Sequence, residues 1–266
     1  MVEWLRSRSG RTHVCGHRGH SVGAPENTLA ALAATRACGG TTAEIDTVLT
    51  ADGEIILLHD ISLDRTTNGH GAADALPLAA IAGLDAGGWF APQFAGEPVP
   101  TLAAAIDFAN RQDLGLVVEI KQERRLPLYF DALARVLAQT GGLDRIILIS
   151  FDHTDLKAAK ALLPGLRTEG ITHARHADPV GVARAADLDA LAIEWPRFDA
   201  ADARALHAAG IAIRCHLPRP AWFATQLALG RDHRPRVVEA LADGLIDSLS
   251  GDDVAYLRAL VDEAGA

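Results

Sequence analysis

The sequence has few cysteines, no long apolar run and no excess of basic residues. Its three cysteines, Cys15, Cys38 and Cys215, lack CxxC spacing and are odd in number, which fits a reducing compartment rather than a disulfide scaffold. No run approaches the about 20 apolar residues of a membrane-spanning helix, and the N-terminal residues lack the apolar segment of a secretory signal. The net charge of −9 argues against a general binder of nucleic acid or anionic membranes. We therefore expect a cytoplasmic protein with no nucleic-acid partner and no stable membrane insertion.

Composition and the order of segments predict one α/β barrel. Of the 266 residues, 49% are apolar and 22% are charged, so a large core is available. Short β-rich runs alternate with Ala/Leu-rich helical segments, which predicts parallel strands joined by right-handed crossovers. We expect strands at 12–16, 42–48, 54–58, 115–120, 145–150, 166–171, 188–193, 211–215 and 245–249, and helices at 27–38, 101–111, 127–139, 153–163, 199–209 and 252–262.

Nine strand candidates are one more than an eight-stranded barrel needs. Segments 42–48 and 54–58 are separated only by a short loop with an Asp-Gly hairpin signal, so the second should return antiparallel. The other eight, each followed by helical sequence, favour a TIM (β/α)8 barrel over an open doubly wound sheet. Residues 60–100, rich in Gly, Thr, Pro and Asp, should form a small insertion over the carboxyl-terminal mouth. Because no linker divides the chain, we expect one domain over 1–266.

The segment Cys15-Gly16-His17-Arg18-Gly19 is the most informative one in the chain. A predicted strand runs there into a histidine and an arginine that glycines bracket. The glycines would let the backbone approach a ligand closely, while the histidine can carry a proton and the arginine supplies a fixed cation. The alternative is a strand-to-helix turn with both side chains in water. The segment alone leaves both interpretations open.

Other charged side chains lie near the ends of predicted strands, where TIM barrels place their active sites. Glu44 and Asp46 have i, i+2 spacing, which puts both on one side of a strand, and Glu119 and Lys121 repeat the pattern. His59 ends the returning hairpin arm. Charged residues inside apolar strands are costly unless they pair with one another or bind a metal. These positions therefore indicate a functional site.

Together these side chains suit a metal site with acid–base groups beside it. Three carboxylates without a nearby cysteine form a hard oxygen site, suited to Mg²⁺ or Ca²⁺ and poorly suited to zinc. The two histidines could share acid and base roles, and the arginine and lysine could neutralise a phosphate or carboxylate. The alternative is a pair of structural ion pairs, Glu44 with Arg18 and Glu119 with Lys121. Convergence of all seven residues at one barrel end argues against it; they are His17, Arg18, Glu44, Asp46, His59, Glu119 and Lys121.

A series of short motifs gives these residues a more specific context. The motifs occur in the order His17-Arg18-Gly19, Pro25-Glu26-Asn27-Thr28, Glu44-Ile45-Asp46, Thr50-Ala51-Asp52-Gly53, His59-Asp60, Leu63-Asp64-Arg65-Thr66-Thr67-Asn68-Gly69, Pro100-Thr101-Leu102 and Glu119-Ile120-Lys121. Each is weak alone, but the ordered series resembles the glycerophosphodiester phosphodiesterase family. Ser150-Phe151-Asp152 continues the likeness.

The resemblance implies both a reaction and a cofactor. The expected activity is hydrolysis of a glycerophosphodiester, a small anionic substrate, to glycerol 3-phosphate and an alcohol. The expected cofactor is one divalent metal ion, with Mg²⁺ slightly preferred over Ca²⁺. Either water or the neighbouring glycerol hydroxyl could attack, and the sequence leaves both open. By motif, the resemblance assigns the acid/base roles to His17 and His59. It assigns the metal ligands to Glu44, Asp46 and Glu119, and the phosphate contacts to Arg18 and Lys121.

The likeness weakens in the carboxyl-terminal half. Where the family usually carries Trp-Thr-Val-Asn, residues 211–218 read Ile-Ala-Ile-Arg-Cys-His-Leu-Pro, so Arg214 and His216 replace an apolar wall. They could bind a more polar or anionic leaving group, such as a sugar or a second phosphate; alternatively, they face the barrel exterior or pair locally. Trp195 could supply the missing aromatic wall or simply pack in the core. The Trp89-Phe90 pair is expected in a small core of the insertion rather than in a substrate clamp.

Two other functions compete with glycerophosphodiester hydrolysis. A phosphodiesterase of the same barrel with a different head-group preference also stays open. The first competing function is intramolecular transphosphorylation, as in related phospholipase D toxins and phosphatidylinositol-cleaving lipases. Those proteins usually have a secretion signal or an apolar rim, and neither is visible here. The second is a non-catalytic phosphodiester-binding protein, which would not need two proton carriers. The oligomeric state stays open.

Overall fold

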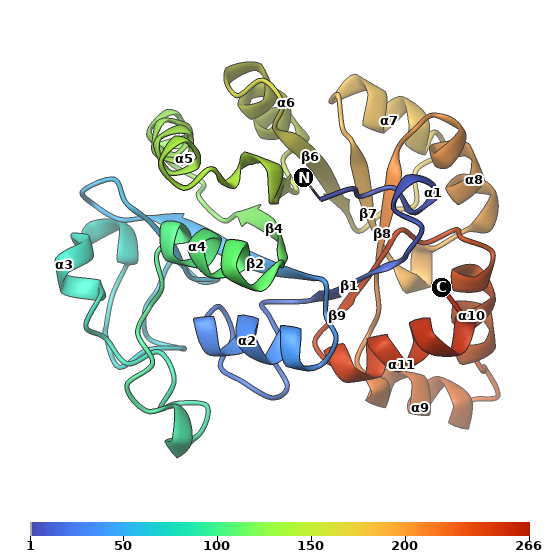
Figure 1. Ribbon diagram of the computed structural model, residues 1–266, viewed down its shortest axis with the longest axis horizontal. Helices are drawn as coiled ribbons and strands as arrows, with labels where there is room; N and C mark the ends of the chain where they lie inside the picture. Colours follow the sequence, from blue (N-terminus) through green and yellow to red (C-terminus); the bar gives the residue numbers. More distant parts are fainter. Residues whose placement is uncertain (1) are drawn as a thin grey trace.

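Eight parallel strands close into a barrel in this computed structural model, which describes residues 2–266 (Figure 1). Around the barrel the order is β1-β9-β8-β7-β6-β5-β4-β2, and β2 pairs with β1 to close it. The predicted TIM barrel is confirmed. The prediction of one domain over 1–266 stays a prediction, and Met1 lies outside the described residues. The strands are β1 (His13–Gly16), β2 (Thr42–Leu49), β4 (Gly115–Ile120), β5 (Ile146–Ser150), β6 (Arg167–Thr172), β7 (Ala190–Glu194), β8 (Ala212–His216) and β9 (Ser248–Gly251).

The surplus strand is the predicted hairpin arm. β3 (Ile55–Leu57) pairs antiparallel with the end of β2, with Thr47 opposite Leu57. The turn between them contains Gly53 at a φ of 85°, a left-handed conformation that favours glycine. The hairpin therefore extends the loop after the second barrel strand, as the Asp-Gly signal predicts.

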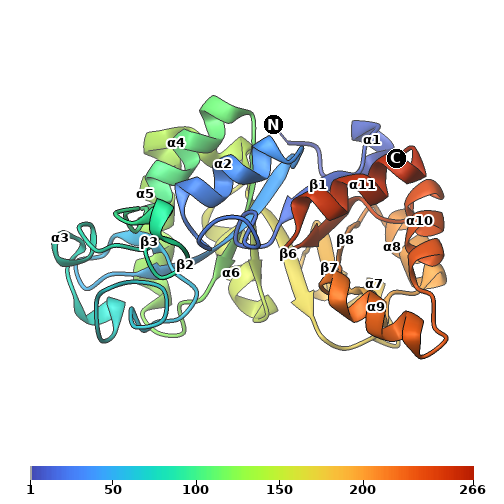
Figure 2. The same ribbon diagram turned by 90° about the horizontal axis from the view of Figure 1, so that it is seen from below.

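Helices cover the outside of the barrel between successive strands (Figures 1 and 2). Thr28, Thr101 and Asp253 each accept a hydrogen bond from the backbone N–H three residues later, which fixes where three of the helices begin. The helices that follow barrel strands are α2 (Leu29–Ala37), α4 (Leu102–Gln112), α5 (Leu126–Thr140), α6 (His153–Leu162), α7 (Pro179–Ala185), α8 (Ala200–Ala208), α9 (Pro220–Ala228), α10 (Arg234–Ala242) and α11 (Val254–Ala264).

Three of these helices were not predicted from the sequence, and the last strand begins later than predicted. The helices α7, α9 and α10 have no counterpart in the predicted set. The last strand is predicted at 245–249 but begins at Ser248, where it pairs with His13 of β1. Leu245 and Ile246 are apolar because they are buried in the core before the ladder starts, not because they belong to the strand.

Alternation along the strands positions the functional side chains. Inside the barrel, Cys15, Val117 and Ile147 form an apolar layer with Trp4, which lies just before the short helix α1 (Arg6–Ser9). Two residues after Val117, the same side of β4 carries Glu119. The polar layer therefore lies on top of an apolar floor, toward the carboxyl ends of the strands.

The segment after β3 is an insertion with a core of its own. It contains the short helix α3 (Leu78–Ile81) and the 3-10 turns η1 (Ala73–Ala75) and η2 (Pro92–Phe94), and it lies beside β2 (Figures 1 and 2). Its core is built by Val48, Ile56, Leu58, Leu63, Ala73, Ile81, Ala86 and Val99. The expectation that Trp89 and Phe90 belong to this core is wrong. Both line a separate cavity with His17 and Arg18, and Trp89 is 43% exposed.

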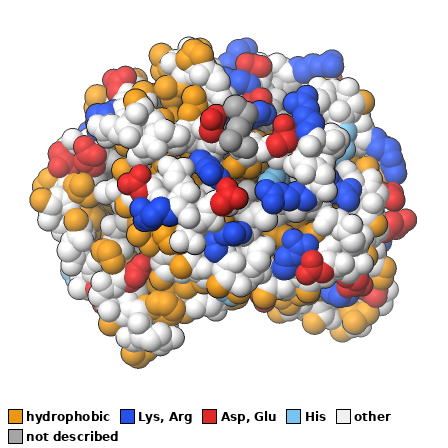
Figure 3. All heavy atoms as spheres, viewed as in Figure 1, with side chains coloured by type: hydrophobic (Ala, Val, Ile, Leu, Met, Phe, Trp, Pro, Cys, Tyr) orange, Lys and Arg blue, Asp and Glu red, His pale blue; other side chains and the backbone are white. Residues whose placement is uncertain are grey.

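The surface around α1 carries charges of both signs. Figure 3 shows Lys and Arg side chains interspersed with Asp and Glu side chains on this face. Within residues 2–266, no helix is both long and apolar enough to cross a membrane. A cytoplasmic location stays a prediction.

Candidate active site

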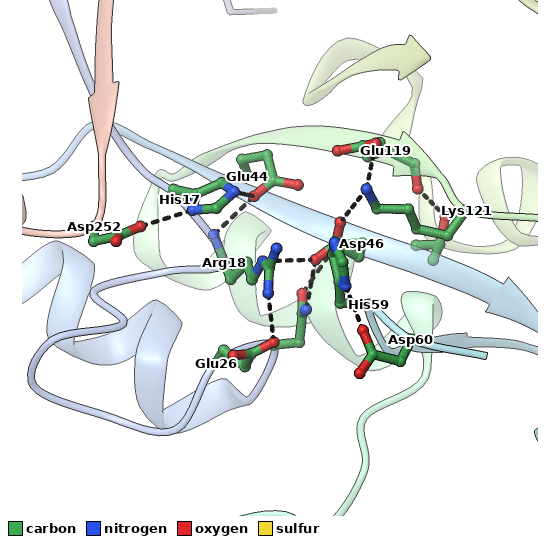
Figure 4. Close-up of polar contacts among 12 residues, drawn as sticks. His17, Arg18, Glu26, Glu44, Asp46, His59, Asp60, Glu119, Lys121 and Asp252 are labelled. Carbon is green, nitrogen blue, oxygen red and sulfur yellow. Dashed lines mark hydrogen bonds and ion pairs between the residues drawn. The ribbon is translucent and has the colours of Figure 1, made fainter. Parts of the chain in front are cut away.

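Three carboxylates from β2 and β4 lie together inside the carboxyl-terminal end of the barrel (Figure 4). Asp46 and Glu119 are register partners on the two strands, and Glu44 lies two residues before Asp46 on the same side. One oxygen from each carboxylate lies within 4.8 Å of the others. The sequence-predicted ligand set is therefore brought together by strand pairing alone.

The environment of these carboxylates suits a cation. All three are buried, and burial together with the neighbouring Asp46 raises the pKa of Glu44 to about 8. Oε1 of Glu44 and Oδ1 of Asp46 are buried without a hydrogen-bond partner in the described residues. Such oxygens are costly unless a cation uses them. Hard oxygen donors fit Mg²⁺ or Ca²⁺, so these residues could hold a divalent metal ion.

Asn27 clamps Asp46, a role that the motif around Asn27 did not by itself predict. Its Nδ2 donates to Oδ2 of Asp46 at 2.8 Å, and its Oδ1 accepts the Asp46 backbone N–H at 2.9 Å. Asn27 is buried and has a φ of 58°, so the loop after β1 is wound tightly to make this contact. The Pro25-Glu26-Asn27-Thr28 motif contained the signal, because Asn tolerates the left-handed region better than most residues.

Arg18 and Lys121 both pair with the carboxylates. Nη1 of Arg18 donates to Glu26 at 2.8 Å, and its Nε lies 3.3 Å from Oδ2 of Asp46. Nζ of Lys121 lies 2.6 Å from Glu119 and 3.5 Å from Asp46. The ion pair between Glu119 and Lys121 thus exists, whereas Arg18 meets Glu44 through its backbone N–H at 2.7 Å. Both cations also line the central cavity, so pairing does not remove them from a ligand's reach.

The glycines around His17 are required by the packing of the turn that they form. A Cβ on Gly16 would lie 2.7 Å from the carbonyl carbon of Gly19, and one on Gly19 would lie 2.6 Å from Cβ of Ala31 in α2. Gly19 also has a φ of 81°. These residues let the turn after β1 pack against α2, and the expected close approach to a ligand stays a prediction.

The two predicted acid/base histidines are both oriented by an aspartate. Nδ1 of His17 donates to Asp252 at 2.7 Å, and Nδ1 of His59 donates to Asp60 at 2.6 Å. Burial disfavours charge on His17, but the Asp252 hydrogen bond and the charge of Glu44 outweigh it and raise the pKa of His17. With Nδ1 occupied, Nε2 is the ring nitrogen left for proton exchange, and Nε2 of His17 lies 4.0 Å from Glu44.

A cavity of about 320 Å³ joins these groups. Its lining includes both acid/base histidines, both cations and two of the carboxylates, together with side chains on or just after strands β5 to β8. The lining residues include His17, Arg18, Glu44, His59, Glu119, Lys121, Phe151, His173, Glu194, Arg214 and His216. The predicted acid/base histidines, the two cations and two of the three predicted metal ligands therefore meet in one cavity.

Two predictions about the far wall of the cavity need correction. Trp195 is buried and stacks on Phe198 at 5.4 Å between ring centroids, within the core and outside the cavity, so it supplies no aromatic wall. Arg214 points into the barrel, where its guanidinium donates to Oε1 of Glu169 at 2.6 Å; the expected alternative of local pairing is thus observed, and the exterior position is wrong. His216 does line the cavity, as predicted.

Comparison with known proteins agrees with this geometry. The model of the glycerophosphoryl diester phosphodiesterase family matches residues 17–247, a range that contains every predicted site residue. The chain belongs to this family. A glycerophosphodiester phosphodiesterase from Caldanaerobacter subterraneus subsp. tengcongensis is 37% identical over 158 residues, which are 59% of this chain. A putative glycerophosphodiester phosphodiesterase from Bacillus subtilis is 34% identical over 160 residues, or 60% of the chain. The chain spans 65% of the length of these two relatives.

Solved structures of family members match nearly the whole chain. A phosphodiesterase from Oleispira antarctica, solved with its product sn-glycerol-3-phosphate, is 29% identical with a TM-score of 0.81; the match covers 96% of this chain and 99% of that one. A glycerophosphodiester phosphodiesterase from Agrobacterium tumefaciens is 25% identical with a TM-score of 0.77, and the match covers 96% and 100% of the two chains.

The crowding of the three carboxylates predicts that Glu44→Gln stabilises the metal-free protein. Gln keeps an oxygen for the Arg18 N–H but removes one buried charge, so we expect the free energy of unfolding at pH 8.5 to rise by about 2 kcal/mol. Urea unfolding in the presence of a chelator measures this change. With Mg²⁺ added, the wild type should gain more stability than the variant, because the variant has lost a ligand.

The control is Glu54→Gln, which removes an exposed carboxylate paired with Arg135 and should change neither quantity by more than about 0.5 kcal/mol. A metal-free wild type that is more stable than Glu44→Gln would contradict the idea that the cluster is strained without a cation.

Proposed function

We propose that the protein hydrolyses glycerophosphodiesters to glycerol 3-phosphate and an alcohol. One arrangement carries this proposal: two histidines, each with Nδ1 bound to an aspartate, lie in the same cavity as a buried carboxylate cluster and two cations. Membership of the phosphodiesterase family and the product bound in the Oleispira antarctica structure support the same reaction.

We propose that Glu44, Asp46 and Glu119 hold one divalent cation, with Mg²⁺ slightly preferred over Ca²⁺. The two buried carboxylate oxygens without hydrogen-bond partners support this assignment. A bound cation would offset the negative charge that builds on the phosphoryl oxygens in the transition state. The Lys121 ammonium would then donate hydrogen bonds to both Glu119 and a phosphoryl oxygen, and Arg18 would supply a second positive charge.

His17 and His59 would move the two protons of the reaction. One Nε2 takes the proton of the attacking oxygen, and the other gives a proton to the leaving alkoxide. Asp252 and Asp60 keep each ring in the orientation that presents Nε2. Their contacts also argue against pure binding, since a binding site gains nothing from two oriented proton carriers. The attacking oxygen is either water or the neighbouring glycerol hydroxyl; the second would release a cyclic phosphate first, which phosphorus NMR of the early products would detect.

Replacement of either histidine by alanine should abolish most of the activity. We expect kcat for glycerophosphocholine with Mg²⁺ to fall by about 10²–10⁴-fold in His17→Ala and in His59→Ala, since each loses one proton transfer. Release of glycerol 3-phosphate is the measurement. The control, His70→Ala, removes an exposed histidine of the insertion and should leave kcat unchanged. If the wild type turned over no member of a diester panel with Mg²⁺, Mn²⁺ or Ca²⁺, the proposed function would be wrong.

Asp252→Asn should both weaken catalysis and shift its pH dependence. The substitution removes a negative charge that raises the pKa of His17, so that pKa should fall. The limb of the kcat/KM profile that reports His17 then moves to lower pH, whether the ring serves as base or as acid. We also expect about a 100-fold loss at the optimum, because the ring is less well oriented.

The matched control for this profile is Asp113→Asn, an exposed aspartate just before β4 at the opposite end of the barrel. Its profile should overlay that of the wild type. A limb that stays in place in Asp252→Asn would show that His17 does not control it.

A further inference from the structure

The wall of the cavity formed by β7, β8 and β9 carries polar side chains that the proposed reaction does not use. Glu194, His216 and Ser250 are register partners on these neighbouring strands. Glu194 and His216 line the cavity, and Ser250 lies behind His216. The wall lies on the far side of the barrel from the strands β2 and β4, which carry the carboxylate cluster.

A chain of hydrogen bonds fixes the proton of His216. Nη1 of Arg214 lies 3.4 Å from Oγ of Ser250, and this oxygen lies 3.2 Å from Nδ1 of His216. The Ser250 hydroxyl is fully buried, and a guanidinium can only donate, so among the contacts of this hydroxyl only Nδ1 of His216 can accept its hydrogen. Nδ1 of His216 is then the acceptor, and the proton of the neutral ring is on Nε2. No hydrogen-bond partner of Nε2 occurs among residues 2–266.

The ring of His216 is also kept uncharged. Burial opposes a charge there, and the neighbouring His17 and Arg214 add repulsion, so the pKa of His216 is lowered to about 3. The rings of His17 and His216 meet edge to face at 5.1 Å between centroids. His216 therefore presents a neutral N–H donor to the cavity across the neutral pH range.

Charge on this wall disfavours a second phosphate. Glu169 occupies the Arg214 guanidinium through Nε and Nη2, both at 2.6 Å. The remaining charged group on the wall is Glu194, whose Oε1 pairs with Nδ1 of His173 at 3.0 Å. The wall thus offers a donor and a carboxylate acceptor on two adjacent strands, and adjacent strands lie about 4.8 Å apart. This arrangement suits two hydroxyls on neighbouring carbons.

We propose that His216 and Glu194 recognise a vicinal diol of the substrate, with Nε2–H of His216 donating to one hydroxyl oxygen and the Glu194 carboxylate accepting from the other. The proposal rests on the proposed phosphodiesterase function and deepens it. Two parts of a glycerophosphodiester can carry such a diol: the glycerol of the glycerol phosphate, and a polyol in the leaving alcohol. The chemistry of recognition is the same for both.

The test compares selectivity between wild type and His216→Phe, which keeps a ring of similar size and loses the donor. One arm measures kcat/KM for glycerophosphocholine against its analogue without the terminal hydroxyl, which retains the hydroxyl next to the ester. The other arm compares glycerophosphoglycerol with glycerophosphoethanolamine. We expect the substitution to reduce the diol preference at least about 10-fold in one arm, which identifies the source of the diol.

Two further variants separate recognition from structural damage. His216→Gln can place an N–H near the position of Nε2 and should recover part of the preference, whereas a purely structural role would not be restored. Ser250→Ala removes the partner that fixes the proton and should lower the preference by a smaller factor, about threefold. His70→Phe is the matched control and should leave both ratios unchanged.

The outcomes distinguish this proposal from the proposed function. Turnover with both ratios unchanged in His216→Phe would overturn diol recognition and leave the phosphodiesterase intact. Diol recognition would also be overturned if a preference for choline or ethanolamine were lost in Glu194→Gln. If the wild type turned over nothing, the proposed function would fail, and calorimetry would still test recognition. In His216→Phe, the affinity for glycerol 3-phosphate relative to inorganic phosphate, or that for glycerophosphoglycerol relative to glycerophosphoethanolamine, should fall about 10-fold. Two unchanged affinity ratios would overturn diol recognition.

Discussion

The burial of Glu44, Asp46 and Glu119 within 4.8 Å of one another is the constraint on which the rest of the site depends. Carboxylates that close repel one another strongly in a poorly hydrated interior, so each needs a partner. Asn27 and the backbone of Arg18 supply neutral hydrogen bonds, and the Arg18 and Lys121 side chains supply charge. These contacts satisfy some of the oxygens. They leave Oε1 of Glu44 and Oδ1 of Asp46 without a hydrogen-bond partner, and of these only Oδ1 has an ion pair, with Lys121. The positive side chains around the cluster therefore do not satisfy all of its carboxylate oxygens.

The loop after β1 is shaped by the same constraint. It must bring Arg18 to Glu44 and Asn27 to Asp46. It does so with three residues at positive φ, namely Arg18, Asn27 and the glycine packed against α2, Gly19. The backbone strain is small for each residue, but a looser loop would leave Asp46 without its clamp. His17 lies at the start of this loop, so its position follows from the turn that serves the carboxylates.

The sequence predicts what depends on local pattern and misses what depends on distant pairing. Apolar runs and the Asp-Gly turn suffice for eight barrel strands and the hairpin, and the cost of charges in apolar strands marks Glu44 and Glu119. In contrast, Leu245 and Ile246 look like strand sequence because core burial and strand pairing select the same residue types. The Arg214 pair with Glu169 and the His17 contact with Asp252 join residues 45 and 235 positions apart, and no local pattern signals either.

His17 and His216 show how adjacent imidazoles acquire opposite properties. Their rings are in edge contact, so protonation of one disfavours protonation of the other. Asp252 accepts from Nδ1 of His17, while Arg214 lies near His216; the pKa of the first is raised and that of the second is lowered. Protonation is therefore favoured on His17, which the proposed chemistry needs, and His216 is left as a neutral donor. The Glu169 partner of Arg214 keeps that cation buried beneath the wall, so recognition and proton transfer use neighbouring rings without competing for one charge.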